Sequence, residues 1–365
     1  MMMELNFLFF IYINNMIQGT KKIKNQVKLW LWVGFILVLI QILIGGVTRL
    51  TGSGLSITKW EIVTGTLPPL NADQWLVEFD KYRDTPQYQK INKGMTMDEF
   101  KFIYFWEYFH RLWARLMGFV FIIPAVLFWI RGYFPGWLKI RVVMIFVLAA
   151  LVATFGWIMV ASGLIDRPWV NAYRLSLHLS LAVILLAYIL WTILKTYNFK
   201  TFPHDRMWRM SVLFNAFIFI QIFLGGMVSG MRAALLYPTF PKMKGEWIPS
   251  IIFERGMWNV ENFVQYEVSP FFPALIHTVH RFWAYFLILF IGVYFYRLKD
   301  IFSTPFLRNS QYLILGLFIT QILLGIITVL NSSGTVPVLW GVSHQVVGVL
   351  LFNASLLLTF AFKKG

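Results

Sequence analysis

The chain has 365 residues, of which 58% are hydrophobic and 13% are charged, and its mean hydropathy is +0.66. An ordinary soluble domain is about 25% charged. The composition therefore excludes a soluble globular protein and predicts a protein that is solvated mainly by lipid. The net charge of +16 does not indicate a nucleic-acid partner, because the basic residues stand at the ends of apolar segments. The chain has no cysteine, which excludes disulfides, cysteine-held iron–sulfur clusters and thiolate ligation of haem.

Eight apolar stretches follow a basic N-terminal segment, and each is long enough to cross a bilayer, which takes about 20 mainly apolar residues. Segment 1–28 has its lysines after a short apolar run and lacks a small-residue cleavage site, so we expect a cytoplasmic tail and not a signal peptide. The sequence predicts an all-α integral membrane protein. Its spans are expected at residues 29–50, 103–130, 142–163, 174–196, 209–230, 273–296, 312–331 and 338–362.

The distribution of Lys and Arg predicts the orientation of these helices. With the N-terminus inside, the inner segments carry sixteen Lys and Arg and three acids, whereas the outer segments carry twelve basic residues over more chain. Connectors rich in Lys and Arg stay in the cytoplasm, so both termini are expected inside and the two long connectors, 51–102 and 231–272, outside. No Arg- and Ser-rich presequence is visible, which favours a bacterial inner (plasma) membrane over the mitochondrial inner membrane.

The first four helices and the last four share motifs. The pairs are Gln41-Ile-Leu-Ile-Gly45-Gly46 with Gln221-Ile-Phe-Leu-Gly225-Gly226, and His110-Arg-Leu-Trp-Ala with His280-Arg-Phe-Trp-Ala; a shorter form, Gln321-Ile-Leu-Leu-Gly325, recurs in helix seven. Four spans per half is an even number, which is typical of parallel repeats. We predict two four-helix bundles, 29–197 and 209–365, joined by an inner linker, 198–208, and packed through the helices that carry the Gly–Gly pairs.

Five of the six histidines fall in predicted spans, and the sixth, His204, lies in a charged inner loop and is expected to be solvated. The even-numbered helices all enter from the outer side, and each holds one repeated histidine within about its first two turns, so these four are expected at similar depth. They are His110 and His178 in the first half, and His280 and His344 in the second. Two imidazoles on opposing helices with apolar walls predict a bis-histidine haem site in each half.

Two alternatives apply to these histidines. A histidine in a transmembrane helix can form a structural hydrogen bond to another helix. A zinc or copper ion would need three or four ligands in one place, and only Glu107 or His277 could add a third. The pairing of histidines in both halves favours haem over both.

Four arginines lie within or at the edges of the predicted helices, at the outer end where haem propionates would emerge. They are Arg49, Arg111, Arg115 and Arg281. A guanidinium binds a carboxylate through two hydrogen bonds, so these residues are candidates for propionate contacts. For Arg49 and Arg115 the alternative is a side chain that extends to the lipid headgroups.

The halves differ three residues before the repeated histidine, where Glu107 stands in the first half and His277 in the second. Positions i and i+3 share a helix face, so Glu107 should border the haem near His110, where a carboxylate can relay protons. The alternative makes Glu107 an ion-pair partner of a nearby arginine. The asymmetry predicts one reactive haem and one electron-transfer haem, and we assign no role to His277.

Several motifs together resemble the haem A synthase family over nearly the whole chain. Its members oxidise a methyl group of haem O to the formyl group of haem A for cytochrome oxidase assembly, and the first long loop without cysteine is similar to the mitochondrial and proteobacterial branch. The motifs are GGVTRLTGSGLS from Gly45 to Ser56, GTLPP from Gly65 to Pro69, TPQY from Thr85 to Tyr88, KFIYFWEYFHR from Lys101 to Arg111 and GWIMVASGL from Gly156 to Leu164.

The resemblance implies roles that the residues alone do not. His110 and His178 would hold the substrate haem, Glu107 would take part in its oxidation, and His280 and His344 would hold a permanent haem b. Haem O would be the substrate, and haem O synthase would supply it. The protein would exchange electrons with a partner and could form a homo-oligomer.

The residues by themselves indicate only a haem-binding repeat. A passive bis-histidine cytochrome b that exchanges electrons with quinone is therefore the main alternative. A transporter is a third class, but it would need helices that are broken near mid-membrane. The glycine pairs lie too close to the outer end of their helices to mark such breaks.

Overall fold

The computed structural model describes residues 23–59, 67–164, 167–197, 199, 201–299, 301 and 304–363. Within these ranges eight helices are long and apolar enough to cross a membrane, which confirms the predicted all-α membrane protein. The tail up to residue 22, the first two residues of the GTLPP motif and linker residues 198 and 200 lie outside the described residues. The spans are α2 (Asn25–Leu50), α5 (Met97–Ile130), α6 (Gly136–Ala161), α7 (Ala172–Thr196), α8 (Asp205–Gly230), α10 (Phe271–Leu298), α11 (Pro305–Leu330) and α12 (Val338–Phe362).

Most of these helices begin earlier than predicted. Helix α5 begins at Met97 instead of residue 103, because Thr96 and Glu99 form a capping box around its polar first turn. Helix α11 begins at Pro305 instead of residue 312, behind an N-cap at Thr304. The expectation for His204 is also wrong, since it is half-buried and its side chain accepts the Met207 N–H to cap α8. Hydropathy finds the lipid-facing part of a helix, whereas hydrogen bonding decides where the helix starts.

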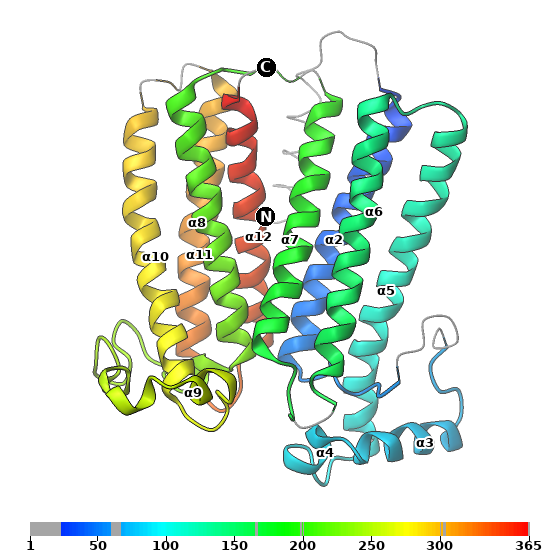
Figure 1. Cartoon of the computed structure of the whole chain (residues 1–365), viewed down its shortest axis with the longest axis vertical. Coiled ribbons are helices and arrows are strands. Elements are labelled where there is room, and N and C mark those ends of the chain that lie inside the picture. The colour runs from blue at the N-terminus through cyan, green and yellow to red at the C-terminus, as the bar shows by residue number, and fades with distance from the viewer. Residues whose placement is uncertain are drawn as a thin grey trace.

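The two long connectors lie at the same end of the bundle, as Figure 1 shows, and the end of α12 lies at the other. The first connector contains α3 (Ala72–Arg83) and α4 (Pro86–Lys90), and the second contains α9 (Val260–Val264) after three short 3-10 helices. Helix α3 packs on the extension of α5 through a buried cluster that includes Phe79, Tyr82 and Phe100. This cluster explains why α5 continues beyond its apolar span.

Corresponding helices of the two halves match in length and register. Helices α2 and α8 both have 26 residues and start 180 positions apart, α6 and α11 both have 26 and start 169 apart, and α7 and α12 both have 25 and start 166 apart. Helix α10 has 28 residues, fewer than the 34 of α5, because it lacks the protruding first turns of α5. A residue in one half therefore has a defined counterpart in the other.

The four central helices pack across the junction of the halves. Helix α7 packs against α8 and α2 against α12, while α5 and α10 lie at opposite edges in Figure 1. A Cβ atom added to Gly46 would lie 3.0 Å from Gln345 Nε2, and one added to Gly226 would lie 2.8 Å from Ser176 Oγ. The predicted contact through glycine is thus correct for the second residue of each Gly–Gly pair, because only this residue faces the other half.

Candidate functional site

A cavity of about 1520 Å³ is lined by residues of both halves, including all four repeated histidines. Ligand pockets typically measure about 300–1,000 Å³, so this cavity has room for more than one ligand. Most of its walls are apolar helix surfaces, with polar side chains at a few positions. The structure therefore brings His110, His178, His280 and His344 to one shared space between the helices.

Each of the four imidazole rings packs against a glycine on a neighbouring helix of its own half. A Cβ atom added to that glycine would meet the ring at 2.8 to 3.3 Å, so a side chain there would displace the histidine. The pairs are His110 with Gly45, His178 with Gly156, His280 with Gly225, and His344 with Gly325. The glycines thus fix where each ring can lie.

Backbone carbonyl groups orient two of the rings. The Nδ1 atom of His178 lies 3.0 Å from the carbonyl oxygen of Val152, and that of His344 lies 3.0 Å from the carbonyl oxygen of Gln321. A carbonyl only accepts, so Nδ1 donates and carries the proton. The lone pair is then on Nε2, which is the arrangement that second-shell contacts give to metal-binding histidines.

Three glutamines of the cavity wall stand one turn before a glycine of these pairs. Gln41 and Gln221 donate to the backbone carbonyls of His110 and His280, at 3.1 and 3.0 Å. The Oε1 atoms of Gln41, Gln221 and Gln321 are buried and have no hydrogen-bond partner among the described residues. Buried acceptors are normally satisfied, so these atoms indicate that a polar group or water belongs in the cavity.

These features fit a haem in each half. A haem iron takes its axial ligands from one or two side chains, and each half offers two imidazoles in an apolar wall. Within the described part of the chain, no group of three or more His, Cys, Asp or Glu side chains could hold a metal ion. The donor set therefore suits an iron that already has four ligands from a macrocycle.

The predicted position of the histidines along their helices needs a correction. His178 and His344 lie in the second turns of α7 and α12, as expected. His110 lies in the fourth turn of α5 and His280 in the third turn of α10, because both helices start before the apolar segment does. All four still line one cavity, since the extra turns lie outside the spans.

Glu107 is held by the first connector and by Arg111. Its side chain is 3% exposed. One carboxylate oxygen accepts from Ser56 Oγ at 2.8 Å and from the Ile57 N–H at 2.9 Å, and the other pairs with Arg111 at 2.5 Å. The ion pair that the sequence left as an alternative is therefore present, and Glu107 also lines the cavity.

The second half repeats this arrangement with different chemistry. The Nε–H of Arg281 donates to His277 Nε2 at 3.1 Å, and its Nη2 donates to the carbonyls of Tyr237 and Thr239. Arg111 likewise donates to the carbonyls of Ile57 and Lys59. Glu107 and His277 thus share one task, which is to accept from the arginine that anchors the following connector. Only the carboxylate adds negative charge to the cavity wall.

The two other candidate arginines also line the cavity. Arg49 donates from Nη2 to the carbonyls of Ser229 and Gly230 at 2.7 and 3.1 Å, so it caps the C-terminal end of α8 from the other half. It therefore does not extend to the lipid headgroups. Arg115 lies one turn beyond Arg111 on the same wall.

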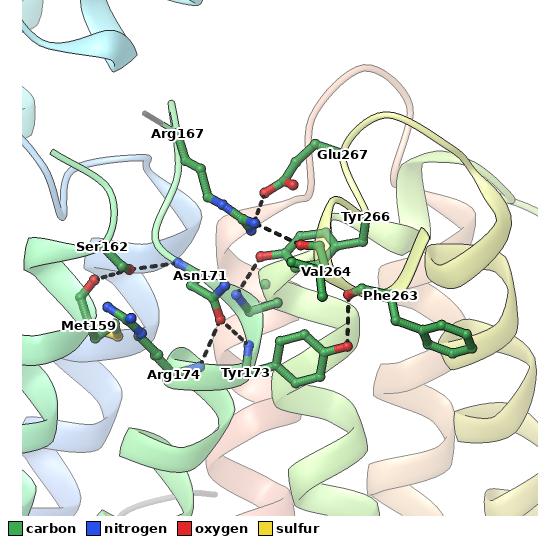
Figure 2. Close-up of polar contacts among 12 residues, drawn as sticks. Met159, Ser162, Arg167, Asn171, Tyr173, Arg174, Phe263, Val264, Tyr266 and Glu267 are labelled. Atoms are coloured by element: carbon green, nitrogen blue, oxygen red, sulfur yellow. Dashed lines mark hydrogen bonds and ion pairs between the residues drawn. The ribbon is translucent and has the colours of Figure 1, made fainter. Parts of the chain in front are cut away.

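The second connector is bonded to the segment between α6 and α7, as Figure 2 shows. Arg167 pairs with Glu267 at 3.0 Å and donates to the Val264 carbonyl at 2.7 Å. The Tyr266 hydroxyl accepts the Ala172 N–H at 2.7 Å. These contacts hold segment 167–174, whose Trp169 and Val170 line the cavity.

Sequence reasoning identified the repeated Gln-x-x-x-Gly motifs but did not predict that their glutamines and glycines surround the histidines. The recurring Gln-x-x-x-Gly spacing was a usable signal in helices one, five and seven. The spacing is not recognisable in helix three, because Val152 occupies the position of the glutamine and only its backbone carbonyl contacts the histidine, His178. Trp169 lies outside every repeated motif, so no pattern pointed to it.

Comparisons with known proteins show the family of the chain. The family model described as "Cytochrome oxidase assembly protein" (COX15-CtaA) matches residues 28–356. A protein of Nitrosomonas eutropha named "Heme A synthase" is 39% identical over 336 residues, covering 90% of this chain and 92% of its own. Proteins with the same name from Brucella anthropi and Brucella ovis are each 37% identical, over 94% and 93% of this chain and 94% and 90% of their own. The chain therefore belongs to the COX15-CtaA family of cytochrome oxidase assembly proteins.

Proposed function

We propose that this chain is a haem A synthase, an oxidoreductase that converts a methyl group of haem O into the formyl group of haem A. The observation that carries the proposal is the cavity with a histidine pair in each half, of which the first borders the buried carboxylate Glu107. The family and the named relatives support the reaction. Delivery of the substrate by haem O synthase and an external electron partner belong to the same proposal.

His110 and His178 hold the substrate, and His280 and His344 hold a permanent haem b. The cavity wall supports this division, because three small residues of the first half have bulky counterparts in the second. The pairs are Gly118 with Ile288, Ala149 with Phe318 and Ala153 with Ile322. Haem O carries a long isoprenoid side chain that haem b lacks, and the smaller side chains at these three positions of the first half leave space there for it.

The reaction removes four electrons, since a methyl group becomes an aldehyde through two hydroxylations and the loss of water. The permanent haem supplies electron transfer when it is bound. The protein's own residues would hold the substrate by its iron, surround it with mainly apolar walls, and place the Glu107 carboxylate where it can accept and return protons. The Arg111 contact keeps that carboxylate in place.

Pigment analysis tests this function. Expression in a bacterial host that makes haem O but lacks its own haem A synthase is expected to yield haem A in extracted pigments, measured by chromatography and absorbance. The host with an empty vector is the control. A well-expressed protein that binds haem and leaves only haem O in the extract would instead support the passive cytochrome.

The protein is a multi-span membrane protein, and we place it in the bacterial inner membrane with the start of α2 and the end of α12 on the cytoplasmic side. The Lys and Arg distribution supports this orientation. Reporter fusions that end at Lys299 or Lys363 are expected to be active as cytoplasmic reporters, and fusions that end near Asp80 or Glu254 as external ones. The reverse pattern would place the long connectors in the cytoplasm.

A further inference from the structure

A second cationic group lies beside Arg49, at the junction of the halves. The guanidinium carbon of Arg232 lies 3.3 Å from the centre of the Trp169 ring, and Arg232 Nη2 lies 4.0 Å from where a Cβ atom on Gly52 would be. Gly52, Trp169 and Arg49 all line the shared cavity. Arg49 therefore lines the cavity itself, and Arg232 from the other half lies against two of its lining residues, Trp169 and Gly52.

The backbone at Arg232 is strained in a way that the other half avoids. Arg232 has a φ of 53° and its counterpart after α2 is Gly52, with a φ of 71°. Glycine adopts this left-handed conformation freely, whereas any residue with a Cβ atom does so at a cost. The second half therefore carries an arginine where the same turn in the first half carries the residue that the geometry favours.

Among the residues that the structure describes, no acid forms an ion pair with Arg49 or Arg232. The ion pairs among the described residues involve other arginines and lysines. Arg49 has a buried Nε atom without a hydrogen-bond partner in this part of the chain. Burial, and then the neighbouring charge of Arg49, lower the pKa of Arg232 to about 9, so both groups are still positive at pH 7. Two buried like charges need an anion nearby.

We propose that Arg49 and Arg232 together bind a carboxylate, namely a propionate of a haem held in the shared cavity. The assignment rests on the proposed function, because that function supplies the dicarboxylate ligand. Arg111 and Arg281 suit this task less, since each is already bonded to a side chain on its own helix, Arg111 to Glu107 and Arg281 to His277. A guanidinium pair also binds a carboxylate with specific geometry.

Tyr266 can complete the site. Its hydroxyl accepts the Ala172 N–H, and Ala172 packs against Gly230, whose carbonyl accepts from Arg49. Burial raises the pKa of Tyr266, so the phenol keeps its proton and can donate one hydrogen bond. The carboxylate would then be held by groups from α2, from the turn after α8 and from the second connector, which links haem binding to the junction of the halves.

The test compares protohaem with its dimethyl ester, in which both propionates are uncharged. Full-length protein purified from haem-deficient cells is titrated with each compound and followed by absorbance. The wild type is expected to bind the acid more tightly than the ester. Arg232→Gly should reduce that preference about 10-fold or more, because a charge-assisted contact is lost, and should raise the melting temperature of the haem-free protein, since it removes strain and like-charge repulsion.

The matched control is Arg141→Gln, which alters a half-buried arginine bonded to Thr192 at the opposite end of the bundle and should keep the wild-type preference. An Arg232→Gly protein that also keeps this preference would refute the carboxylate site. Equal wild-type affinity for acid and ester would refute it too, while leaving the proposed function intact, and loss of co-purified phospholipid from Arg232→Gly would then identify a lipid phosphate as the anion. A wild type that takes up neither compound would refute the proposed function and this site together.

Discussion

Replacing Glu107 with glutamine is expected to lower haem A formation by at least about 100-fold, the lower range for loss of a general acid–base group, while the second-half haem remains bound. Glutamine keeps an oxygen that can accept from Ser56 and Ile57, but it loses the titratable proton and the ion pair with Arg111. Haem O or a partly oxidised haem should therefore accumulate. The measurement is the ratio of haem O to haem A in pigments from equal amounts of purified protein.

Two controls separate chemistry from anchoring of the connector. Ser56→Ala removes one hydrogen bond to Glu107 and keeps the carboxylate, so it should retain haem A formation. His277→Gln changes the counterpart position and the acceptor of Arg281 in the second half, and it should also retain the reaction. If Glu107 acted only as an anchor, Glu107→Gln and Ser56→Ala would both lower expression or haem content. Normal haem A output from a well-expressed Glu107→Gln protein would refute the catalytic role.

The number of spans and the grouping of histidines could be predicted from the sequence because both depend on local patterns. A stretch of about 20 apolar residues has few alternatives to a transmembrane helix. His110 and His280 share a motif with the same neighbours, so their similar places at the cavity follow from the repeat. These features depend on the order of residues along single helices.

Features that depend on contacts between helices could not be predicted in the same way. The early start of α5 requires the packing of α3, which no hydropathy pattern reveals. From the sequence, Glu107 and His277 were expected to have different roles, since one is a carboxylate and the other an imidazole. The structure gives them the same partner, an arginine four residues later. The proposed role of Arg232 could not be predicted, because it depends on a comparison with Gly52 in the other half and on a contact with Trp169 in a different loop.

Replacing either His280 or His344 with alanine is expected to abolish the low-spin b-type spectrum of the purified protein. Each variant removes one of the two repeated imidazoles of the second half that line the cavity. In the His344 variant the contact between His344 Nδ1 and the Gln321 carbonyl is lost as well. Absorbance and the haem-to-protein ratio measure the loss. His110→Ala and His178→Ala should leave this spectrum in place, because they act on the other half.

His277→Ala is the closest control for these ligand variants. His277 lies three residues before His280 on α10 and lines the same cavity, but its Nε2 atom accepts from Arg281, so the b-type spectrum should persist. Loss of a cofactor also removes the stability that its binding adds, so a missing spectrum must be separated from misfolding. Imidazole added to His344→Ala should occupy the space beside Gly325 and restore a low-spin spectrum, which a misfolded protein could not do. An unchanged spectrum in both His280→Ala and His344→Ala would show that the iron takes its ligands from elsewhere.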